Sequence, residues 1–271
     1  MMQCMRFFAP LLAVGLTMTA AAKDRILFVG AHPDDPDINF GGSAVRFSRE
    51  GATVRFLSVC NGSKGHRVLS EEALAERRFG EMQRSAAILG VGKYTTLGCP
   101  DCELEATMAW KKRVTQAIRE FAPHLVFTHR TCDYHPDPRA TGKLVMDASY
   151  LLGVPHWVPE AEAQRRRPVI LYMSDSFTVP KEMRADIMID AEPYLDRWCE
   201  GLDAQVSQFY DWLPWDKGTE DEVRALGDRK DIKARNAYIL KHWVGRKRYD
   251  AKRFAATWKE QYPDKPAPKY M

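Results

Sequence analysis

Apolar and polar positions along the first two-thirds of the chain form a pattern that predicts strands separated by helices. Short apolar runs typical of buried parallel strands occur at 25–31, 52–59, 94–97, 125–129 and 168–174. Stretches with apolar residues at helical spacing lie between them, at 37–50, 70–89, 110–121 and 142–152. This order predicts an α/β fold with a Rossmann-like, mostly parallel, doubly wound sheet flanked by helices.

The last third of the chain has a helical pattern only. Within 192–213 the spacing predicts one amphipathic helix with an apolar side made of Leu195, Trp198, Leu202, Val206, Phe209 and Leu213. Residues 220–260 are charged and helical in pattern, and the Pro- and Lys-rich tail 263–271 is expected to be loose. We therefore predict an α/β core over 23–190 and a helical C-terminal extension over 191–271 that packs on the core.

Residues 1–22 have the pattern of a secretory signal peptide. Arg6 is their only charged residue, a mostly apolar stretch follows, and residues 20–22 supply an A-x-A cleavage site. Pro10 and Gly15 interrupt the apolar stretch, which is short for a membrane span. The sequence thus predicts an exported protein, periplasmic or extracellular, without a membrane span.

The charge balance narrows the function classes. The 271 residues carry a formal net charge of +4, which falls to +3 if Arg6 is removed with the signal peptide. A charge this close to zero argues against a nucleic-acid-binding protein. The basic residues near the end of the chain are interpreted as one solvated helix face, made of Arg246 to Arg248, Lys252 and Arg253.

The mature chain would keep an odd number of cysteines. Five of the six lie beyond residue 22, at Cys60, Cys99, Cys102, Cys132 and Cys199. An odd count in an exported protein leaves at least one thiol free or paired between chains. Cys99-Pro-Asp-Cys102 has the spacing of a redox motif, but it lacks the second pair of a structural zinc site. A local disulfide or free thiols are the interpretations that we favour over catalysis.

Polar loops follow three of the predicted strands. They are His32 to Asp35, Asn61 to His66 and His129 to Asp137. In a doubly wound sheet, ligands bind beyond the carboxyl ends of the strands, so these three loops should converge on one crevice. The first strand is not followed by GxGxxG and the sequence contains no GxSxG, which disfavours a dinucleotide-dependent oxidoreductase and a serine hydrolase.

The first of these loops has the composition of a hydrolytic metal site. His32 and Asp35 are three residues apart, and such positions come close in a turn, so an imidazole nitrogen and a carboxylate can face one ion. Asp34 between them points elsewhere and is free to hold a water molecule. A Pro-containing surface turn is the simpler interpretation of this tetrapeptide. The expected convergence of three polar loops favours the metal site.

The three loops together resemble the LmbE-like, or PIG-L, family of metal-dependent N-deacetylases. The resemblance covers most of residues 25–180. The first signature matches Ala31-His-Pro-Asp-Asp35 with Gly41-Gly42, and the second loop matches Asn61-Gly62 with Gly65-His66. Further matches are Arg78-x-x-Glu81, Leu89-Gly90-Val91, Thr128-His129, Asp133-Tyr-His-Pro-Asp137 and Arg139-Ala-Thr141.

This resemblance implies a zinc hydrolase that removes acetyl from an N-acetylated amino sugar or glycoconjugate, such as an N-acetylglucosamine unit. His32 and Asp35 would be ligands of Zn²⁺ or another divalent metal. Asp34 would be the general base, and His135 would donate to the tetrahedral oxyanion. Amide hydrolysis needs a strong nucleophile, a base and a donor for the developing charge, which these residue types supply. The expected substrate contacts on the same loops are Asn61, His66 and Asp133.

One position departs from the family pattern. The second signature normally reads His-Pro-Asp-His, and its last histidine is the third metal ligand, but this chain has Pro138 there. A catalytic zinc site normally keeps three protein ligands. A neighbour can replace the missing ligand, the candidates being Asp137, Cys132 and His129. Alternatively, His135 enters the metal shell and gives up its oxyanion role. If the ion is instead weak or absent, the protein is a catalytically weak or inactive carbohydrate-binding relative.

Overall fold

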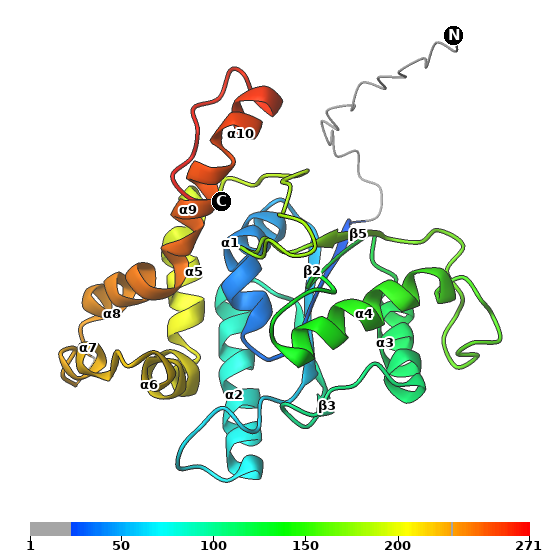
Figure 1. The fold of residues 1–271 in the computed structure, drawn as a ribbon, viewed down its shortest axis with the longest axis horizontal. Coiled ribbons are helices and arrows are strands. Elements are labelled where there is room, and N and C mark those ends of the chain that lie inside the picture. Colours follow the sequence, from blue (N-terminus) through cyan, green and yellow to red (C-terminus); the bar gives the residue numbers. More distant parts are fainter. Residues whose placement is uncertain (1–22, 229) are drawn as a thin grey trace.

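The computed structural model describes residues 23–228 and 230–271, and the predicted signal peptide lies outside them (Figure 1). Five parallel strands form one sheet in the order β3-β2-β1-β4-β5. Their bounds are β1 Arg25–Gly30, β2 Thr53–Cys60, β3 Lys93–Cys99, β4 Leu125–Thr128 and β5 Val169–Tyr172. The prediction of a Rossmann-like parallel sheet is therefore confirmed.

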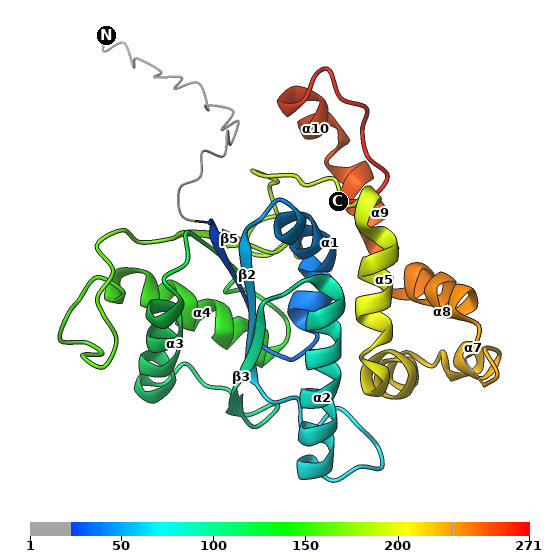
Figure 2. The same cartoon turned by 180° about the vertical axis from the view of Figure 1, so that it is seen from behind.

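Helices cover both faces of this sheet. Figures 1 and 2 show α1 (Asp35–Arg49) and α2 (Glu71–Leu89) on one face and α3 (Met108–Phe121) and α4 (Pro136–Leu151) on the other. Successive strand side chains point to opposite faces, so each strand contributes to two apolar layers. The layer with α1 and α2 contains Ile26, Phe28, Val54 and Phe56, and the layer with α3 and α4 contains Leu27, Val29, Leu57 and Val59.

The start of α4 differs from the sequence pattern in a way that matters for the site. The pattern placed this helix after Thr141, whereas the structure begins it at Pro136. Prolines are tolerated in the first turn of a helix because the N–H groups there have no partner within the helix. Pro136 and Pro138 both occupy that turn. Asp137 and Pro138 are therefore held on a helix and do not belong to a loose loop.

The single helix expected over 192–213 is not formed. The segment divides into a 3-10 turn (Glu192–Tyr194), α5 (Leu195–Asp203), a π-helical turn (Ser207–Trp212) and α6 (Leu213–Lys217). The break follows from buried polar contacts, because the backbone N–H and hydroxyl of Ser207 both donate to the Glu81 carboxylate on α2. Residues 220–260 are likewise divided, into α7 (Glu220–Arg224), α8 (Ile232–Ile239), a π-helical turn (Leu240–Val244), α9 (Arg246–Arg253) and α10 (Ala255–Gln261).

The extension contacts the core through α5, which lies against α1 and α2 (Figure 2). Trp198 is the central residue of this contact. Its indole lies directly on the paired glycines of α1, where a Cβ added to Gly41 would stand 2.2 Å from Trp198 Cδ1. Trp198 Nε1 also donates to the carbonyl of Asp37 at 2.7 Å. The Gly41-Gly42 pair therefore allows a close helix–helix approach at a fully buried indole.

The tail is ordered against the extension, so the expectation of a loose tail is wrong. Tyr270 is 8% exposed and belongs to the apolar cluster of the extension. Its carbonyl accepts the Ala191 N–H at 3.1 Å, and the Pro266 carbonyl accepts Trp258 Nε1–H at 3.1 Å. The Pro- and Lys-rich composition of the tail indicates that it forms no helix or strand. Composition carries no signal for the burial of the Tyr270 ring. In the described part of the chain, no helix has the length and apolar character needed to cross a membrane.

Strand order places the site. β1 is the central strand, with β2 on one side and β4 on the other, so the chain reverses its direction of winding beside β1. In open α/β sheets the crevice outside the carboxyl ends at such a point is the usual ligand site. The polar loops that follow β1, β2 and β4 all begin there.

Candidate functional site

The turn after β1 holds His32 and Asp35 close together. The His32 backbone N–H donates to Asp35 Oδ2 at 2.7 Å, and His32 Nδ1 lies 3.5 Å from the same oxygen. Burial raises the pKa of Asp35, but His129 and His32 outweigh it and hold that pKa well below its ordinary value. The carboxylate is therefore charged, and one of its oxygens faces an imidazole nitrogen.

The other nitrogen of His32 faces two acids. Nε2 lies 2.9 Å from Asp101 Oδ1 and 3.2 Å from Asp137 Oδ2. Burial by itself lowers the pKa of His32, but the hydrogen bonds to Asp101, Asp137 and Asp35 hold it well above its usual value. A histidine that binds a metal through one nitrogen commonly donates its other N–H to a carboxylate. His32 is thus arranged with Nδ1 toward Asp35 and Nε2–H toward its orienting acids.

Asp101 and Asp137 are fixed and deeply buried. Asp137 is 0% exposed, and its oxygens accept the backbone N–H groups of Cys102 at 2.7 Å and Leu104 at 3.2 Å. Burial raises the pKa of Asp101, but His32 outweighs it and lowers that pKa to about 2. Asp101 is not among the site residues predicted from the sequence, because the pattern Cys99-Pro-Asp-Cys102 directs attention to its cysteines. The available signal was that this loop, too, follows a strand of the sheet.

Asp34 is held by Arg78. Arg78 Nη2 donates to Asp34 Oδ1 at 2.7 Å, and Nη1 donates to the carbonyl of Gly62 at 3.3 Å. The guanidinium lies directly against Gly62, which has a φ of +71° and would place a Cβ 2.2 Å from Arg78 Nη1. The first and second polar loops are therefore joined through one buried arginine. Asp34 lines the cavity, with Oδ2 outside this pair.

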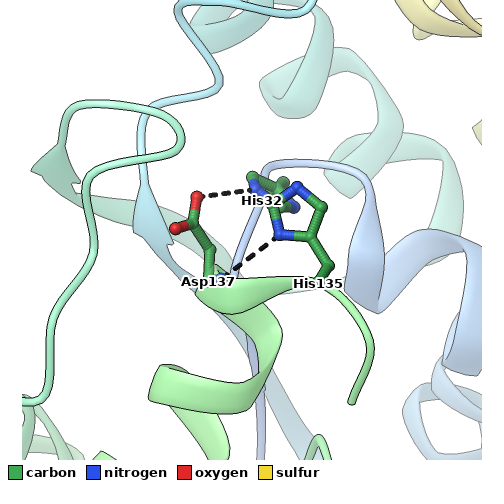
Figure 3. Close-up of side chains that lie close together, drawn as sticks. All are labelled: His32, His135 and Asp137. Atoms are coloured by element: carbon green, nitrogen blue, oxygen red, sulfur yellow. Dashed lines mark hydrogen bonds and ion pairs between the residues drawn. The ribbon is translucent and has the colours of Figure 1, made fainter.

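His135 caps α4 and turns its ring toward His32. Its Nδ1 accepts the Asp137 N–H at 3.2 Å, while its own backbone N–H donates to Asp133 Oδ1 at 2.9 Å. The two imidazole centroids are 5.0 Å apart and nearly perpendicular (Figure 3). In a neutral imidazole whose Nδ1 accepts, the proton lies on Nε2. His135 therefore offers a donor, which is the chemistry expected for an oxyanion contact.

His129 lies on the Asp35 side of the site. Its Nε2 accepts the Ala31 N–H at 3.1 Å and lies 3.1 Å from Asp35 Oδ2. Its Nδ1 is 3.9 Å from Asp133 Oδ2. The side chain is buried but lines the cavity. The ring is thus held at both nitrogens, and its Nε2 lies between the Ala31 N–H and the Asp35 carboxylate.

These loops surround one cavity of about 660 Å³ at the carboxyl ends of the strands. Its lining includes the predicted catalytic and metal-binding residues His32, Asp34, Asp35 and His135, together with Asp133, Asp101 and His129. The second loop contributes Lys64 and Gly65. Its members Asn61 and His66 make local bonds: Asn61 Oδ1 accepts the Ser63 N–H, and His66 Nδ1 accepts the Val68 N–H. Their assignment as substrate contacts stays a prediction.

The same loops carry the match to known proteins. Residues 27–149 match the family model described as PIG-L: GlcNAc-PI de-N-acetylase. The matched segment is called the PIG-L domain. It contains every catalytic and metal-binding residue predicted from the sequence.

Two curated relatives show how far the likeness extends. A diacetylchitobiose deacetylase from Thermococcus kodakarensis is 34% identical over 138 residues, which is 49% of this chain and 52% of that protein. A 1D-myo-inositol 2-acetamido-2-deoxy-alpha-D-glucopyranoside deacetylase from Kineococcus radiotolerans is 40% identical over 138 residues, 39% of this chain and 38% of that protein. The chain thus spans about half the length of these relatives or less.

Solved structures confirm the fold beyond the PIG-L domain. An N,N'-diacetylchitobiose deacetylase from Pyrococcus horikoshii has a TM-score of 0.64 at 24% identity and covers 77% of this chain and 80% of its own. A 4-carboxy-2-hydroxymuconate hydratase from Pseudomonas putida has a TM-score of 0.62 at 18% identity, covering 76% of this chain and 89% of its own. One of these proteins is a deacetylase and the other a hydratase, so the fold leaves the reaction open.

The PIG-L domain of this chain has a donor set suited to a divalent metal, except at Pro138. His32 Nδ1 and Asp35 Oδ2 face each other at 3.5 Å, a separation that one ion can bridge. Pro138 lines the cavity but offers no side-chain donor. Ligand atoms of His32, His135 and Asp137 also lie within 4.8 Å of one another (Figure 3). The facing pair His32 and Asp35 fits a divalent metal. The histidine that the family has as its third ligand is replaced here by Pro138.

The buried position of Asp137 argues against this second arrangement as a catalytic site. A catalytic metal needs an open coordination position for water or substrate. Asp137 is fully buried and does not line the cavity, and its oxygens already accept two backbone N–H groups. Of the two other replacements considered, His129 lines the cavity beside Asp35, whereas Cys132 is not part of the cavity lining.

The cysteines add no redox chemistry to this site. The five cysteines in the described part of the chain are free thiols, with Cys99 buried and Cys102 exposed. Burial is the largest cause that raises the pKa of Cys99 and Cys102, and Asp101 and Asp137 raise that of Cys102 further. Thiols with raised pKa values are poor nucleophiles. A local disulfide and free thiols were the two interpretations favoured from the sequence, and the structure has Cys99 and Cys102 as free thiols.

Proposed function

We propose that this protein is a hydrolase that removes acetyl from an N-acetylated amino sugar or glycoconjugate, with a divalent metal such as Zn²⁺ as cofactor. The observation that carries the proposal is the placement of Asp34 and His135 around the facing pair His32 Nδ1 and Asp35 Oδ2 in one cavity. The family match and the deacetylase relatives support the same reaction class.

In this mechanism His32 and Asp35 would hold the metal. Asp101 and Asp137 accept the Nε2–H of His32 and so fix the direction of its Nδ1. His129, whose Nε2 lies beside Asp35, is the side chain placed to serve as the third ligand, and it would exchange its hydrogen bond from the Ala31 N–H for the ion. The bound ion supplies a strong nucleophile near neutral pH by lowering the pKa of water.

Asp34 and His135 perform the proton transfer and the charge stabilisation. Asp34 Oδ2 accepts the proton of the attacking water, while Arg78 keeps the carboxylate in place through Oδ1. His135 Nε2–H donates to the carbonyl oxygen of the acetamide as it becomes negative. Asp34 then returns the proton to the amine nitrogen as the C–N bond breaks. The products are acetate and the free amino sugar.

The test measures acetate release from N-acetylglucosamine and its β-1,4-linked dimer, with metal-stripped and zinc-loaded protein. Activity should require the metal. Asp34→Asn should lower the rate by about 10²- to 10⁴-fold, the usual contribution of a general base, and should leave the zinc content unchanged. Zinc-loaded wild-type protein that releases no acetate from either sugar would contradict the proposal.

Pro138 favours one alternative function. A site that lacks a ligand can bind its sugar without cleaving it, and the protein would then be a carbohydrate-binding relative of the family. The alternative gains support if wild-type protein binds N-acetylated sugars in calorimetry, holds no zinc at micromolar concentration and releases no acetate.

We also propose that the protein is exported, because residues 1–22 have the n-region, apolar stretch and A-x-A end of a signal peptide. The mature chain should begin near Lys23. Mass spectrometry of protein from the periplasm or the medium tests this directly, and an intact Met1 in the exported material would contradict it.

A further inference from the structure

The C-terminal extension supplies the wall of the crevice opposite the PIG-L loops. The lining residues of the extension lie in and next to its two π-helical turns. They include Trp212, Leu213, Asp216, Lys217, Trp243 and Arg246. Trp212 closes the wall against the second loop, since a Cβ on Gly65 would lie 3.2 Å from its ring. A substrate in this crevice must therefore contact the extension as well as the hydrolytic residues.

Two cations on this wall lack an ion-pair partner. Of the lysine and arginine side chains that line the crevice, Lys64 pairs with Glu103, Arg78 with Asp34 and Arg130 with Asp175. In the part of the chain that the structure describes, no carboxylate oxygen lies within 4.0 Å of the Arg246 guanidinium or the Lys217 ammonium. Every other lysine or arginine of the lining is thus neutralised, and these two are not.

Both cations are held in place by neutral groups. Lys217 Nζ lies 3.7 Å from the centroid of the Trp243 ring, which stabilises an ammonium without neutralising it. Arg246 donates through Nη2 to Asn39 Oδ1, and Asn39 Nδ2 donates in turn to the backbone carbonyl of Asp35 at 2.9 Å. A single asparagine therefore connects the guanidinium to the metal-binding turn.

The charges around this pair do not cancel it. Asp216 lines the crevice next to Lys217 and attracts it, yet burial and the charge of Arg246 lower the pKa of Lys217 below its ordinary value. Burial also lowers the pKa of Arg246, against the attraction of Asp250 and Asp35. None of these carboxylates lies within 4.0 Å of either cation, so neither cation has an ion-pair partner among the described residues. An anionic ligand supplies that partner with charge-assisted hydrogen bonds.

We propose that Arg246 and Lys217 form an anion subsite, and that the substrate is an N-acetylated amino sugar that carries a carboxylate or phosphate group away from its acetamide. This inference rests on the proposed function and names the substrate class of the same site. The guanidinium binds either anion through two parallel N–H groups, and the ammonium adds a point charge.

The test compares three sugars with the same ring, which are N-acetylglucosamine, N-acetylglucosamine 1-phosphate and N-acetylmuramic acid. Initial rates of acetate release are measured on zinc-loaded protein, and calorimetric affinities are measured on zinc-loaded Asp34→Asn protein. We expect the anionic sugars to exceed the neutral one by about 10-fold or more, because a charge-assisted hydrogen bond has this effect. The phosphate and carboxylate arms show which anion the subsite prefers.

Variants locate the effect. Arg246→Gln and Lys217→Gln should each weaken the anionic sugars by about 10-fold and change the neutral sugar by less than about 2-fold. Lys252→Gln is the matched control, because Lys252 is an exposed cation on the same helix as Arg246 and does not line the crevice. Raising the salt concentration should reduce the preference for anions in wild-type protein only, Arg246→Gln having already lost it.

The two proposals fail in different ways. Wild-type protein that treats neutral and anionic sugars alike overturns the anion subsite, whether or not acetate is released. Equal losses on all three sugars in Arg246→Gln also overturn it, because the residue would then serve the reaction itself. If the anionic sugars bind more tightly but none is hydrolysed, the subsite stands and the deacetylase proposal fails.

Discussion

His129 Nε2 lies 3.1 Å from Asp35 Oδ2 while the same nitrogen accepts the backbone N–H of Ala31. The single lone pair of that nitrogen is directed at the Ala31 N–H, so His129 can bind an ion here only in exchange for this hydrogen bond. This relationship makes His129 the side chain that can compensate for the proline at position 138.

The metal-binding set is tested by two substitutions. Pro138→His restores the family's ligand and should raise zinc affinity by about 10-fold or more, along with the rate of acetate release. His129→Gln should lower zinc affinity by a similar factor, because it removes the replacement nitrogen. Competition with a chromophoric chelator measures both. If His129→Gln holds zinc like wild type, His129 is not the third ligand.

The role of His135 can be separated from metal binding by His135→Asn. Asparagine is a good helix cap, and its Oδ1 can accept the Asp137 N–H in place of Nδ1, so α4 should keep its first turn. The Nε2–H donor is lost, and kcat should fall by about 10²- to 10³-fold, as for other oxyanion donors. Zinc content and Tm should stay near the wild-type values. A parallel loss of zinc would instead place His135 among the ligands.

Lys247 should give the stability of the protein a specific pH dependence. Burial and the charge of Arg246 lower the pKa of Lys247 to about 8, although Asp250 Oδ2 lies 3.3 Å from its ammonium. The unfolded chain keeps this proton until about pH 10.4, so between these values the unfolded state binds more protons and stability rises with pH.

The rise contributed by Lys247 should be on the order of 3 kcal/mol across that window. Lys247→Met removes the titrating group and should remove the rise, whereas Lys252→Met, an exposed control, should keep it. Urea unfolding at pH 7.5, 8.5 and 9.5 checks this. A Lys247→Met profile parallel to that of wild type would mean that the side chain keeps its ordinary pKa in the folded protein.

The contact between Gly41 and Trp198 should tolerate no added methyl group. Gly41→Ala would place a Cβ 2.2 Å from the indole, and overpacking of this kind costs about 1–3 kcal/mol or more. Gly80→Ala is the matched control on α2, where the nearest atom is the flexible end of Arg84 at 3.4 Å. That change should stabilise the protein by about 0.5–1 kcal/mol, since alanine is the better helix former. Equal effects in denaturant unfolding would contradict the packing account.

The sequence by itself determined the sheet and much of the site. Apolar runs of strand length and helical spacing placed all five strands within a few residues, because these periods report burial directly. The polar loops after β1, β2 and β4 predicted that His32, Asp34, Asp35 and His135 line one crevice, because parallel strands deliver their carboxyl ends to one edge. The departure at Pro138 was also visible without any structure.

Tertiary structure alone decided which distant groups meet at His32 and on the crevice wall. His32 and Asp137 are 105 residues apart, and Asn39 and Arg246 are 207 apart. Periodicity describes neighbours within a few residues along one element, and it carries no information on which loop approaches another. The break in the helix expected over 192–213 has the same cause, because Ser207 leaves the helical pattern to satisfy Glu81, a buried carboxylate on another helix.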